Sequence, residues 1–378
     1  MRAAMDTKEK ISVVDLADLR PDAPASACAQ ASQALRDAFG HFGLVYVKGH
    51  TLTAAEIEAF YDSFMRFTRR PEAYKQSFAR GDLWYQRGWT PPNTEKAVVA
   101  GGQPDFKECF FVAPEPLDAE ARLQYPQLYC DNLWPDDDDG FDARAFRTRY
   151  LQVGRKLHQA GTALLRGCAL ALDLPEDTFV SMIAGGPHVT RVLNYLALRP
   201  EQIHSGILWG EEHTDFNLLT LLPGGRFYDQ AGQACARPDD KSGLYLRTRS
   251  TPDAPAGHMV QGRPPEGCLV AQVGQMLEIL TGGVFLATPH VVTAPGTPGY
   301  SRMSSAHFIH LHSNQVLFPL PRFRHETSVR DYSPPVLAGT YSIKTLVDIG
   351  LAPTSALDRL GYRQYDRLGT IRAQKLGG

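Results

Sequence analysis

His213 and Asp215 stand two residues apart in the stretch WGEEHTDFNLLTLLPGG, at the start of an apolar run. Imidazole and carboxylate groups together are ligands for divalent transition metals. Successive side chains of a β-strand point to opposite faces, so residues two apart share a face and can reach one ion. The chain also has 12 His and 41 Asp or Glu residues, so such a pair arises by chance as well. A metal site therefore requires a third ligand from another strand.

His290, in GGVFLATPHVV, is the best candidate for that third ligand, because it lies in a separate β-rich segment. Two His and one carboxylate on one side of a metal leave coordination positions open. Fe(II) uses such open positions to bind a bidentate co-substrate together with O2. A structural zinc site would close all four positions, usually with cysteine, and none of the six cysteines is placed for that.

Arg302 and Ser304, in GYSRMSSAHF, follow His290 and share one strand face by the same period of two. A guanidinium group donates two parallel hydrogen bonds to a carboxylate, and a neighbouring hydroxyl can add a third. Burying an Arg inside a barrel without a counter-anion is costly. We therefore predict that Arg302 and Ser304 bind a carboxylate that arrives from outside.

The N-terminal half reads mainly as helix. An amphipathic helix is expected at 25–42, followed by a short strand at 44–47. A second helix should begin after Thr53, a suitable N-cap residue, and end before Pro71. The longest helical pattern covers residues 144–173.

From about residue 179 short β-rich runs follow one another, separated by Gly and Pro, among them HVTRVLNYLAL, FNLLTLL, GLYLRTR and GCLVAQVG. Several short strands without helical segments between them predict a sandwich or barrel rather than βαβ units. We predict an α+β fold with a helical N-terminal layer, in an N-terminal α/β region at 1–178. A jelly-roll (double-stranded β-helix) core should follow at 179–320, with a C-terminal helical extension at 321–378.

Composition narrows the class of protein. The chain has 378 residues, 43% hydrophobic and 21% charged, which is typical of a globular enzyme and not of a disordered chain. The net charge of −2 gives no electrostatic footprint for nucleic acid or an anionic membrane. The chain shows no signal peptide and no apolar stretch of the ~20 residues that a membrane span needs. We expect a cytoplasmic protein without nucleic-acid or membrane partners; its oligomeric state stays open.

The ordered motifs are similar to those of one known family. HTDFNLLTLL, MLEILTGGVFLATPHVV and SRMSS resemble the isopenicillin N synthase-like family of Fe(II)/2-oxoglutarate oxygenases. In the N-terminal half, ISVVDLADL, FGHFGLVYVKGH, QRGWTP and PDFKECFFV follow in that family's order. The resemblance is nearest to the bacterial branch that includes the ethylene-forming enzyme. It implies Fe(II), 2-oxoglutarate and O2, with His213, Asp215 and His290 as iron ligands and Arg302 and Ser304 on the distal carboxylate of 2-oxoglutarate.

The sequence departs from the family pattern at two places, one beside the expected co-substrate site and one in a long polar segment. Asn194 and Tyr195, in RVLNYLAL, fall where the family places side chains beside 2-oxoglutarate. Plant members often read Asn-Tyr-Tyr-Pro there, so Arg191 becomes a candidate for steadying the inner carboxylate in this chain. The polar segment 226–264 lengthens the spacing between the His-x-Asp pair and His290. A loop of this length is either a surface excursion or a lid.

Two phenylalanines are candidates for the substrate pocket. Phe308 has the same parity as Arg302 and Ser304, so it should point into the barrel as core or as a pocket wall. Phe216 follows Asp215 and would project to the opposite face of an ideal strand, unless a bulge re-aims it. Three further histidines, His307, His310 and His312, lie beyond the carboxylate site, and we expect them to be hydrogen-bonded or exposed rather than metal-bound.

The resemblance implies that 2-oxoglutarate is decarboxylated to succinate and CO2 while a C–H bond of a small organic substrate is oxidised. Hydroxylation is the default outcome, and desaturation, ring closure or fragmentation of the co-substrate are alternatives. A small amino acid or a secondary-metabolite scaffold suits a bacterial branch. One rival is an oxidase of the same family without 2-oxoglutarate, in which Arg302 and Ser304 hold the substrate's own carboxylate. A non-catalytic jelly-roll binding module is the other, and the intact triad argues against it.

Overall fold

The protein is described by a computed structural model that covers residues 11–94, 106–114, 117–138, 140–203, 209–248 and 257–360. Its core contains a large sheet whose main path has, in spatial order, β1 (Val13–Asp15), β2 (Leu44–Lys48), β12 (Leu269–Val273), β7 (Leu219–Leu222), β14 (Ser301–Ile309), β5 (Val189–Tyr195), β4 (Lys107–Val112) and β3 (Gly88–Thr90). Off this path, β8 (Arg226–Tyr228) pairs with β14, and β9 (Ala234–Cys235) pairs with β8.

A second, smaller sheet completes the core. It contains, in order, β11 (Met259–Gln261), β10 (Gly243–Arg247), β13 (His290–Thr293) and β6 (Gly210–His213), all antiparallel. Two sheets whose strands come from interleaved parts of the chain form a jelly roll. The predicted α+β class with a double-stranded β-helix core is therefore confirmed.

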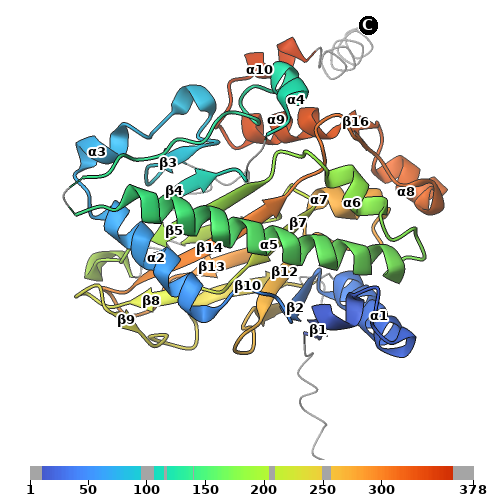
Figure 1. Cartoon of the computed structure of the whole chain (residues 1–378), viewed down its shortest axis with the longest axis horizontal. Helices are drawn as coiled ribbons and strands as arrows, with labels where there is room; N and C mark the ends of the chain where they lie inside the picture. Colours follow the sequence, from blue (N-terminus) through green and yellow to red (C-terminus); the bar gives the residue numbers. More distant parts are fainter. Residues whose placement is uncertain are drawn as a thin grey trace, which may run out of the picture.

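The long helix α5 (Ala143–Ala171) runs across one face of the large sheet, with α2 (Ala54–Thr68) beside it and α1 (Ala25–His41) near one end (Figure 1). Small residues let α5 approach the large sheet closely. A Cβ added to Gly161 would lie 2.3 Å from the side chain of Ile309 in β14. Burial of one large apolar side chain contributes about 1.5–3 kcal/mol. The buried stripe of α5 includes Phe146, Tyr150, Val153, Leu157, Leu164, Leu165 and Cys168.

The helix boundaries follow the sequence signals. Thr53 caps α2 as predicted, since its hydroxyl accepts from the backbone N–H of Glu56 while the Glu56 carboxylate accepts from the backbone N–H of Thr53. This reciprocal arrangement is a capping box, and an N-cap of this kind stabilises a helix by about 1 kcal/mol.

The N-terminal region is more than a helical layer, because it also supplies strands to the large sheet. β2 pairs with β12, and β4 pairs with β5 in a register that places Lys107 opposite Tyr195. The sheet therefore joins segments on both sides of residue 178. This connection fixes the loops around β3 and β4 against the inner side of the barrel.

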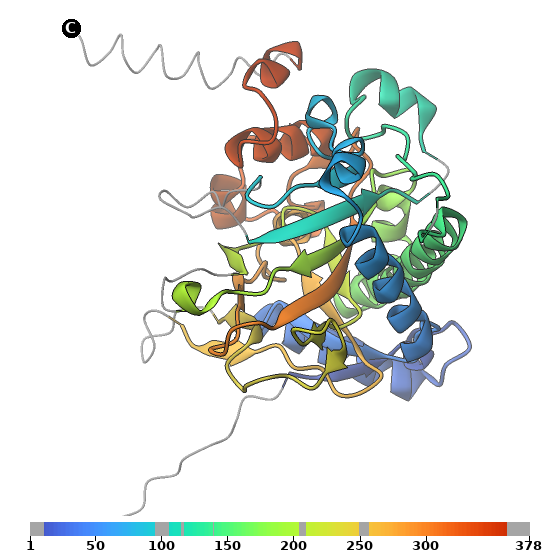
Figure 2. The same ribbon diagram turned by 90° about the vertical axis from the view of Figure 1, so that its left-hand side faces the viewer.

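The C-terminal helices α9 (Ala338–Asp348) and α10 (Ser355–Arg359) confirm the helical extension within the described residues. Figure 2 shows them at one end of the molecule, away from α1. α9 docks through Ile343 and Leu346, which pack with Trp84, Tyr125 and Tyr129 of the N-terminal loops. The remaining short elements are α3 (Glu72–Gln76), α4 (Ala119–Gln124), α6 (Thr178–Ile183), α7 (Gln275–Leu280), α8 (Glu326–Asp331), β15 (Val316–Leu317) and β16 (Val336–Leu337).

The segment 226–264 is built into both sheets. β8 pairs with β14 in the large sheet, and β10 pairs with β13 in the small one. The described part of the segment is thus structural and not a simple surface excursion. Residues 249–256, where a lid would have to be judged, lie outside the described residues.

Candidate active site

The three residues of the predicted metal site meet in the barrel. His213 is the last residue of β6, His290 is the first of β13, and the two are direct partners across these strands. The Nε2 atoms of His213 and His290 lie 3.7 and 3.9 Å from Oδ1 of Asp215. Within the described part of the chain, this is the one group of three or more His, Cys, Asp or Glu side chains that could hold a metal.

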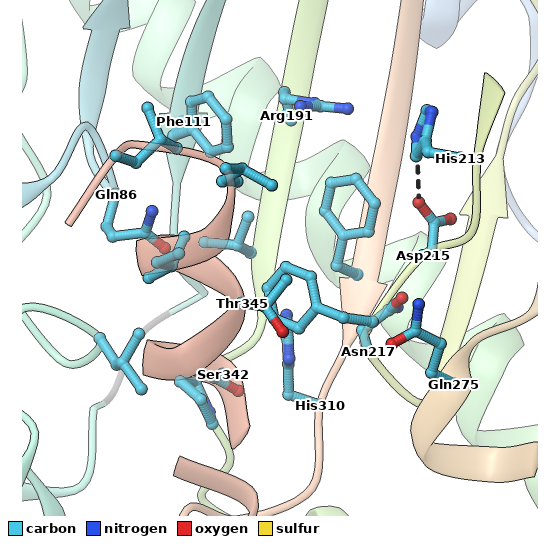
Figure 3. A pocket seen from close by; sticks show the side chains of 18 of the residues that line it. Gln86, Phe111, Arg191, His213, Asp215, Asn217, Gln275, His310, Ser342 and Thr345 are labelled. Carbon is cyan, nitrogen blue, oxygen red and sulfur yellow. Dashed lines mark ion pairs between the residues drawn. The ribbon is translucent and has the colours of Figure 1, made fainter. Parts of the chain in front are cut away.

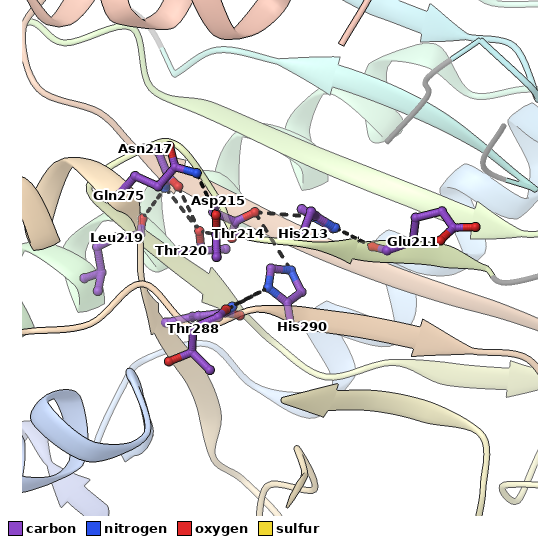
Figure 4. A network of polar contacts seen from close by, with 11 residues as sticks. Glu211, His213, Thr214, Asp215, Asn217, Leu219, Thr220, Gln275, Thr288 and His290 are labelled. Carbon is purple, nitrogen blue, oxygen red and sulfur yellow. Dashed lines mark hydrogen bonds and ion pairs between the residues drawn. The ribbon is translucent and has the colours of Figure 1, made fainter. Parts of the chain in front are cut away.

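Asp215 does not lie on the strand that carries His213. β6 ends at His213, so the expected pairing of the two side chains on one strand face is not how the structure brings them together. Instead, the hydroxyl of Thr220 donates to Oδ2 of Asp215 at 2.7 Å, and the backbone N–H of Gln275 donates to the Asp215 carbonyl at 2.8 Å. Figure 4 shows this network beside the two imidazoles.

A polar contact at Nδ1, the ring nitrogen that does not face the metal site, orients each imidazole ring. Nδ1 of His213 donates to the carbonyl oxygen of Glu211 at 2.7 Å, which leaves its Nε2 as a lone-pair donor. Nδ1 of His290 lies 2.5 Å from the side-chain amide of Gln272, which is fully buried. The nearer amide atom is Nε2, which also donates to the carbonyl of Thr288 at 3.3 Å, while Oε1 has no partner. Amide nitrogen and oxygen have nearly the same shape, and with the two exchanged Oε1 accepts the Nδ1–H proton that a metal-bound His290 carries. Partners of this kind fix the tautomer and the direction of a metal-binding histidine.

The protonation states suit a metal. Burial lowers the pKa of His290 to about 4, with a further contribution from the His213 imidazole, so the ring is neutral at physiological pH. Burial raises the pKa of Asp215, but His290, His213 and the hydroxyl of Thr220 outweigh it, and the pKa lies below its usual value. Two imidazoles and one carboxylate are the donor set that fits Fe(II) with open coordination positions.

Arg302 occupies an aromatic cradle on β14. Its neighbours across the sheet are Tyr195 on β5 and Phe227 on β8, and its guanidinium carbon lies 5.5 and 6.0 Å from the centres of their rings. A Cβ added to Gly225 would come within 2.2 Å of the guanidinium, so only glycine leaves room there. No described carboxylate lies within 4.0 Å of Arg302, although its side chain is buried. Ser304 is also buried, two residues farther on the same strand face.

Asn194 is not brought to this site. Consecutive strand residues point to opposite faces, so Tyr195 faces Arg302 and Asn194 faces the helical side of the sheet. There the Asn194 amide donates to Glu108 at 3.0 Å, and Glu108 also accepts from Trp89 and Lys75. The expectation that Asn194 lies beside the co-substrate does not agree with this position.

A cavity of about 420 Å³ opens beside the triad. Arg191 of β5 lies in its wall, with its guanidinium carbon 5.4 Å from the ring centre of Phe111 and 5.1 Å from that of Phe308. In Figure 3 the metal-site residues lie on one side of the cavity and Gln86 and helix α9 on the other. Phe308 therefore points into the barrel, as its parity predicts.

Phe216 lines the same cavity without the need for a bulge, because the chain has already left β6 at this point. Its ring centre lies 5.4 Å from that of His310. His310 is itself a wall residue, and burial lowers its pKa to about 4, so it is neutral.

Several other residues that line the cavity were not singled out from the sequence, although the loops at 80–115, the segment 226–264 and the C-terminal helices were expected to build the pocket. Some of these residues lie in the motifs QRGWTP and PDFKECFFV. Others come from helix α9. These residues are Gln86, Arg87, Lys107, Phe111, Gln275, Ser342, Thr345 and Leu346.

Comparisons with known families agree with this geometry. Residues 11–137 match the family described as non-haem dioxygenase in morphine synthesis N-terminal. Residues 187–311 match the 2OG-Fe(II) oxygenase superfamily. The chain therefore belongs to the Fe(II)- and 2-oxoglutarate-dependent oxygenases, enzymes that act on small-molecule substrates.

Two curated relatives illustrate the range of the family. The chain is 28% identical over 303 residues to homoarginine-6-hydroxylase from Oryza sativa subsp. japonica, which covers 79% of this chain and 83% of the relative. It is 28% identical over 201 residues to the 2-oxoglutarate-dependent ethylene/succinate-forming enzyme of Ralstonia nicotianae, or 51% of this chain and 54% of that one. This second relative agrees with the predicted bacterial branch.

Solved structures share the fold. T7H of Neurospora crassa in complex with alpha-KG matches with a TM-score of 0.71 at 20% identity, covering 89% of this chain and 96% of that chain. A Caulobacter crescentus protein assigned to the 2OG-Fe(II) oxygenase family matches with a TM-score of 0.70 at 26% identity, covering 90% and 99%. None of the described helices is long and apolar enough to span a membrane.

Proposed function

We propose that His213, Asp215 and His290 bind the catalytic iron, and that Arg302 with Ser304 binds the distal carboxylate of 2-oxoglutarate. The observation that carries this proposal is the presence, in one barrel, of a triad of two imidazoles and a carboxylate and of a buried guanidinium without a described acidic partner. The triad needs a cation, and the guanidinium of Arg302 needs an anion. Fe(II) and 2-oxoglutarate supply both.

Iron bound at the triad supplies the redox chemistry that couples decarboxylation of 2-oxoglutarate to oxidation of a substrate C–H bond. The chain's own contribution is to hold the ligands at fixed positions. Gln272 and the carbonyl of Glu211 hold the imidazole protons at Nδ1, and Thr220 holds the carboxylate of Asp215. These contacts keep the metal-facing atoms free of protons.

Arg191 is the proposed partner of the inner carboxylate of 2-oxoglutarate. Its guanidinium is confined between the rings of Phe111 and Phe308, and its positive charge is close enough to lower the pKa values of Asp215 and His290 slightly. A guanidinium held between two rings presents its N–H groups edge-on and loses little freedom on binding. Tyr195, on β5 like Arg191, has its ring centre 5.5 Å from the guanidinium carbon of Arg302 on the neighbouring strand β14.

The substrate site is proposed to be the cavity beside the triad. Its volume of about 420 Å³ suits a small organic molecule. Phe111, Phe216 and Phe308 would exclude water and contact an apolar part, whereas Gln86 and Thr345 offer hydrogen bonds at the far side. Hydroxylation of an amino acid or a secondary-metabolite scaffold is the proposed reaction, and the cytoplasm is its proposed location.

The proposal is tested with anaerobic protein, Fe(II) and 2-oxoglutarate. A weak visible charge-transfer band should appear, and air should then produce succinate at a rate that a true substrate increases. Candidate substrates are screened by this increase. Substrate oxidation without a band and without succinate would instead support an oxidase that does not use 2-oxoglutarate. Absence of the band, of succinate and of iron binding would reject the proposal.

A further inference from the structure

A second guanidinium lies close to Arg302. Both guanidinium groups lie near the ring of Phe227. The guanidinium carbon of Arg302 is 6.0 Å from the ring centre, and that of Arg237 is 5.7 Å from it. Arg237 belongs to the segment 226–264, whose role the proposed function does not explain. Both cations therefore contact the same aromatic side chain, and one of them has so far no assigned partner.

Strand pairing brings the segment to Arg302, and a ring contact places Arg237. Arg302 is opposite Phe227, and Phe227 is opposite Cys235 in β9. Arg237 lies two residues beyond the end of β9, and its guanidinium carbon is 5.7 Å from the ring centre of Phe227. One N–H of its guanidinium donates to the carbonyl of Ser242.

Glycine provides the space on the Arg237 side, as it does for Arg302. A Cβ added to Gly243 would lie 2.9 Å from Nη1 of Arg237, and this glycine also has a φ of +115°, which other residues rarely adopt. Each guanidinium thus lies against a glycine backbone, with Phe227 shared between them.

Among the described residues, Arg237 has no carboxylate within 4.0 Å. Burial, followed by the charges of Arg263 and Arg302, lowers its pKa, and the smaller opposing contributions of Tyr245 and Asp239 do not offset this. Asp239, the nearest acid in sequence, uses its carboxylate to accept backbone N–H groups of Lys241, Ser242 and Gly296. Two neighbouring cations without an acid between them favour an anion bound near both.

We propose that Arg237 is a second cationic residue of the co-substrate site, contributed by the segment 226–264, which acts with Arg302 on the distal carboxylate of 2-oxoglutarate. This inference rests on the proposed function of Arg302. It assigns a binding role to a segment that lengthens the spacing between Asp215 and His290 relative to the plant members the sequence resembles. It also implies that the site distinguishes dianionic 2-oxo acids from monoanionic ones by more than one ionic contact.

Binding is measured by anaerobic titration of 2-oxoglutarate into the Fe(II) protein, following the charge-transfer band. We compare the wild type with Arg237→Gln and Arg237→Lys. Lys241→Gln is the matched control, because Lys241 lies on the same segment and has an exposed side chain. The Kd should rise about 5- to 30-fold in Arg237→Gln and change little in the other two variants.

A second ligand separates binding from a merely structural role. 2-Oxovalerate has the same chelating end but no distal carboxylate, so its Kd should be nearly the same in the wild type and in Arg237→Gln. An equal loss for both ligands, or no loss for 2-oxoglutarate, would overturn the inference while leaving the proposed function intact. Absence of the band in the wild type would instead reject the proposed function itself.

Discussion

His213 and His290 face each other directly across β6 and β13, and the centres of their imidazole rings are 4.3 Å apart. The register shifts just beyond this pair, between His290 and Val292. A β-bulge beside a functional site re-aims side chains and is a common device at barrel rims. The two ligands are thus placed by main-chain pairing, and only Asp215 depends on a loop.

Replacing His213 by Ala should abolish both iron retention and turnover, because two ligands cannot hold Fe(II) against exchange with solvent. Iron content after gel filtration and succinate release are the measurements. His258→Ala is the control, since His258 is exposed and does not line the cavity. Full activity of the His213 variant would move the ligand assignment elsewhere.

Gln272→Leu should weaken iron binding about 10- to 100-fold, because the Nδ1–H of His290 loses its acceptor and the ring its fixed direction. Gln272→Glu keeps an acceptor oxygen and should retain most of the affinity. Competition with a fluorescent chelator measures the difference. Equal affinities in Gln272→Leu and the wild type would show that Gln272 does not position His290.

Arg302→Leu should weaken 2-oxoglutarate binding by about 2–5 kcal/mol, the range for removing one partner of a buried charge pair. The anaerobic charge-transfer titration reports the loss directly. Arg322→Leu removes an exposed guanidinium that pairs with Asp173 and should leave the Kd unchanged. A normal Kd in the Arg302 variant would reject the carboxylate site.

The cavity can be filled from helix α9, on the side opposite His213 and Asp215 (Figure 3). Thr345→Trp places an indole in the space opposite the triad and should abolish the substrate-stimulated part of succinate release. 2-Oxoglutarate binding should persist, because Arg302 does not line this cavity. Lys344→Trp, on the solvent side of the same helix, is the control. Unchanged substrate stimulation in Thr345→Trp would place the substrate elsewhere.

Acid should destabilise the protein through a buried cluster of histidines. Burial holds the pKa values of His158, His188, His307 and His310 below the ordinary value, to about 4 for His310. The unfolded chain therefore binds more protons than the folded one below about pH 6.5. Stability should be complete above that pH and fall as the pH drops toward 4, by up to about 1.4 kcal/mol per unit for each ring.

Urea denaturation at pH 7, 6 and 5 measures this dependence. His158→Gln removes one member of the cluster, in which Nδ1 of His158 lies 3.2 Å from Nε2 of His307. This variant should show a shallower decline with acid than the wild type. A free energy of unfolding that is equal at pH 7 and pH 5 in the wild type would contradict the prediction.

Much of the fold follows from local patterns. Periodicity located α1, α2 and α5, and composition located the β-rich core, because buried stripes and short apolar runs leave a direct trace in sequence. The metal site and Arg302 were identified by residue type and order. That these residues come together in space depends on the pairing of β6 with β13. Local sequence patterns do not predict this pairing.

The errors have physical causes. Asn194 and Tyr195 were assigned together, although neighbouring strand residues face opposite sides, and only Tyr195 faces Arg302. Asp215 was placed on a strand that in fact ends at His213. The wall formed by α9 depends on how Ile343 and Leu346 dock against distant loops, and that long-range packing has no local signature.

Crystals grown without oxygen, with Fe(II) and 2-oxoglutarate, allow the most direct test through anomalous diffraction at the iron edge. One iron peak should appear about 2.0–2.2 Å from Nε2 of His213, Nε2 of His290 and the carboxylate of Asp215, the distance range for such ligands. The far carboxylate of 2-oxoglutarate should contact Arg302. An iron peak away from these three residues, or Arg302 paired with a protein carboxylate, would contradict the account.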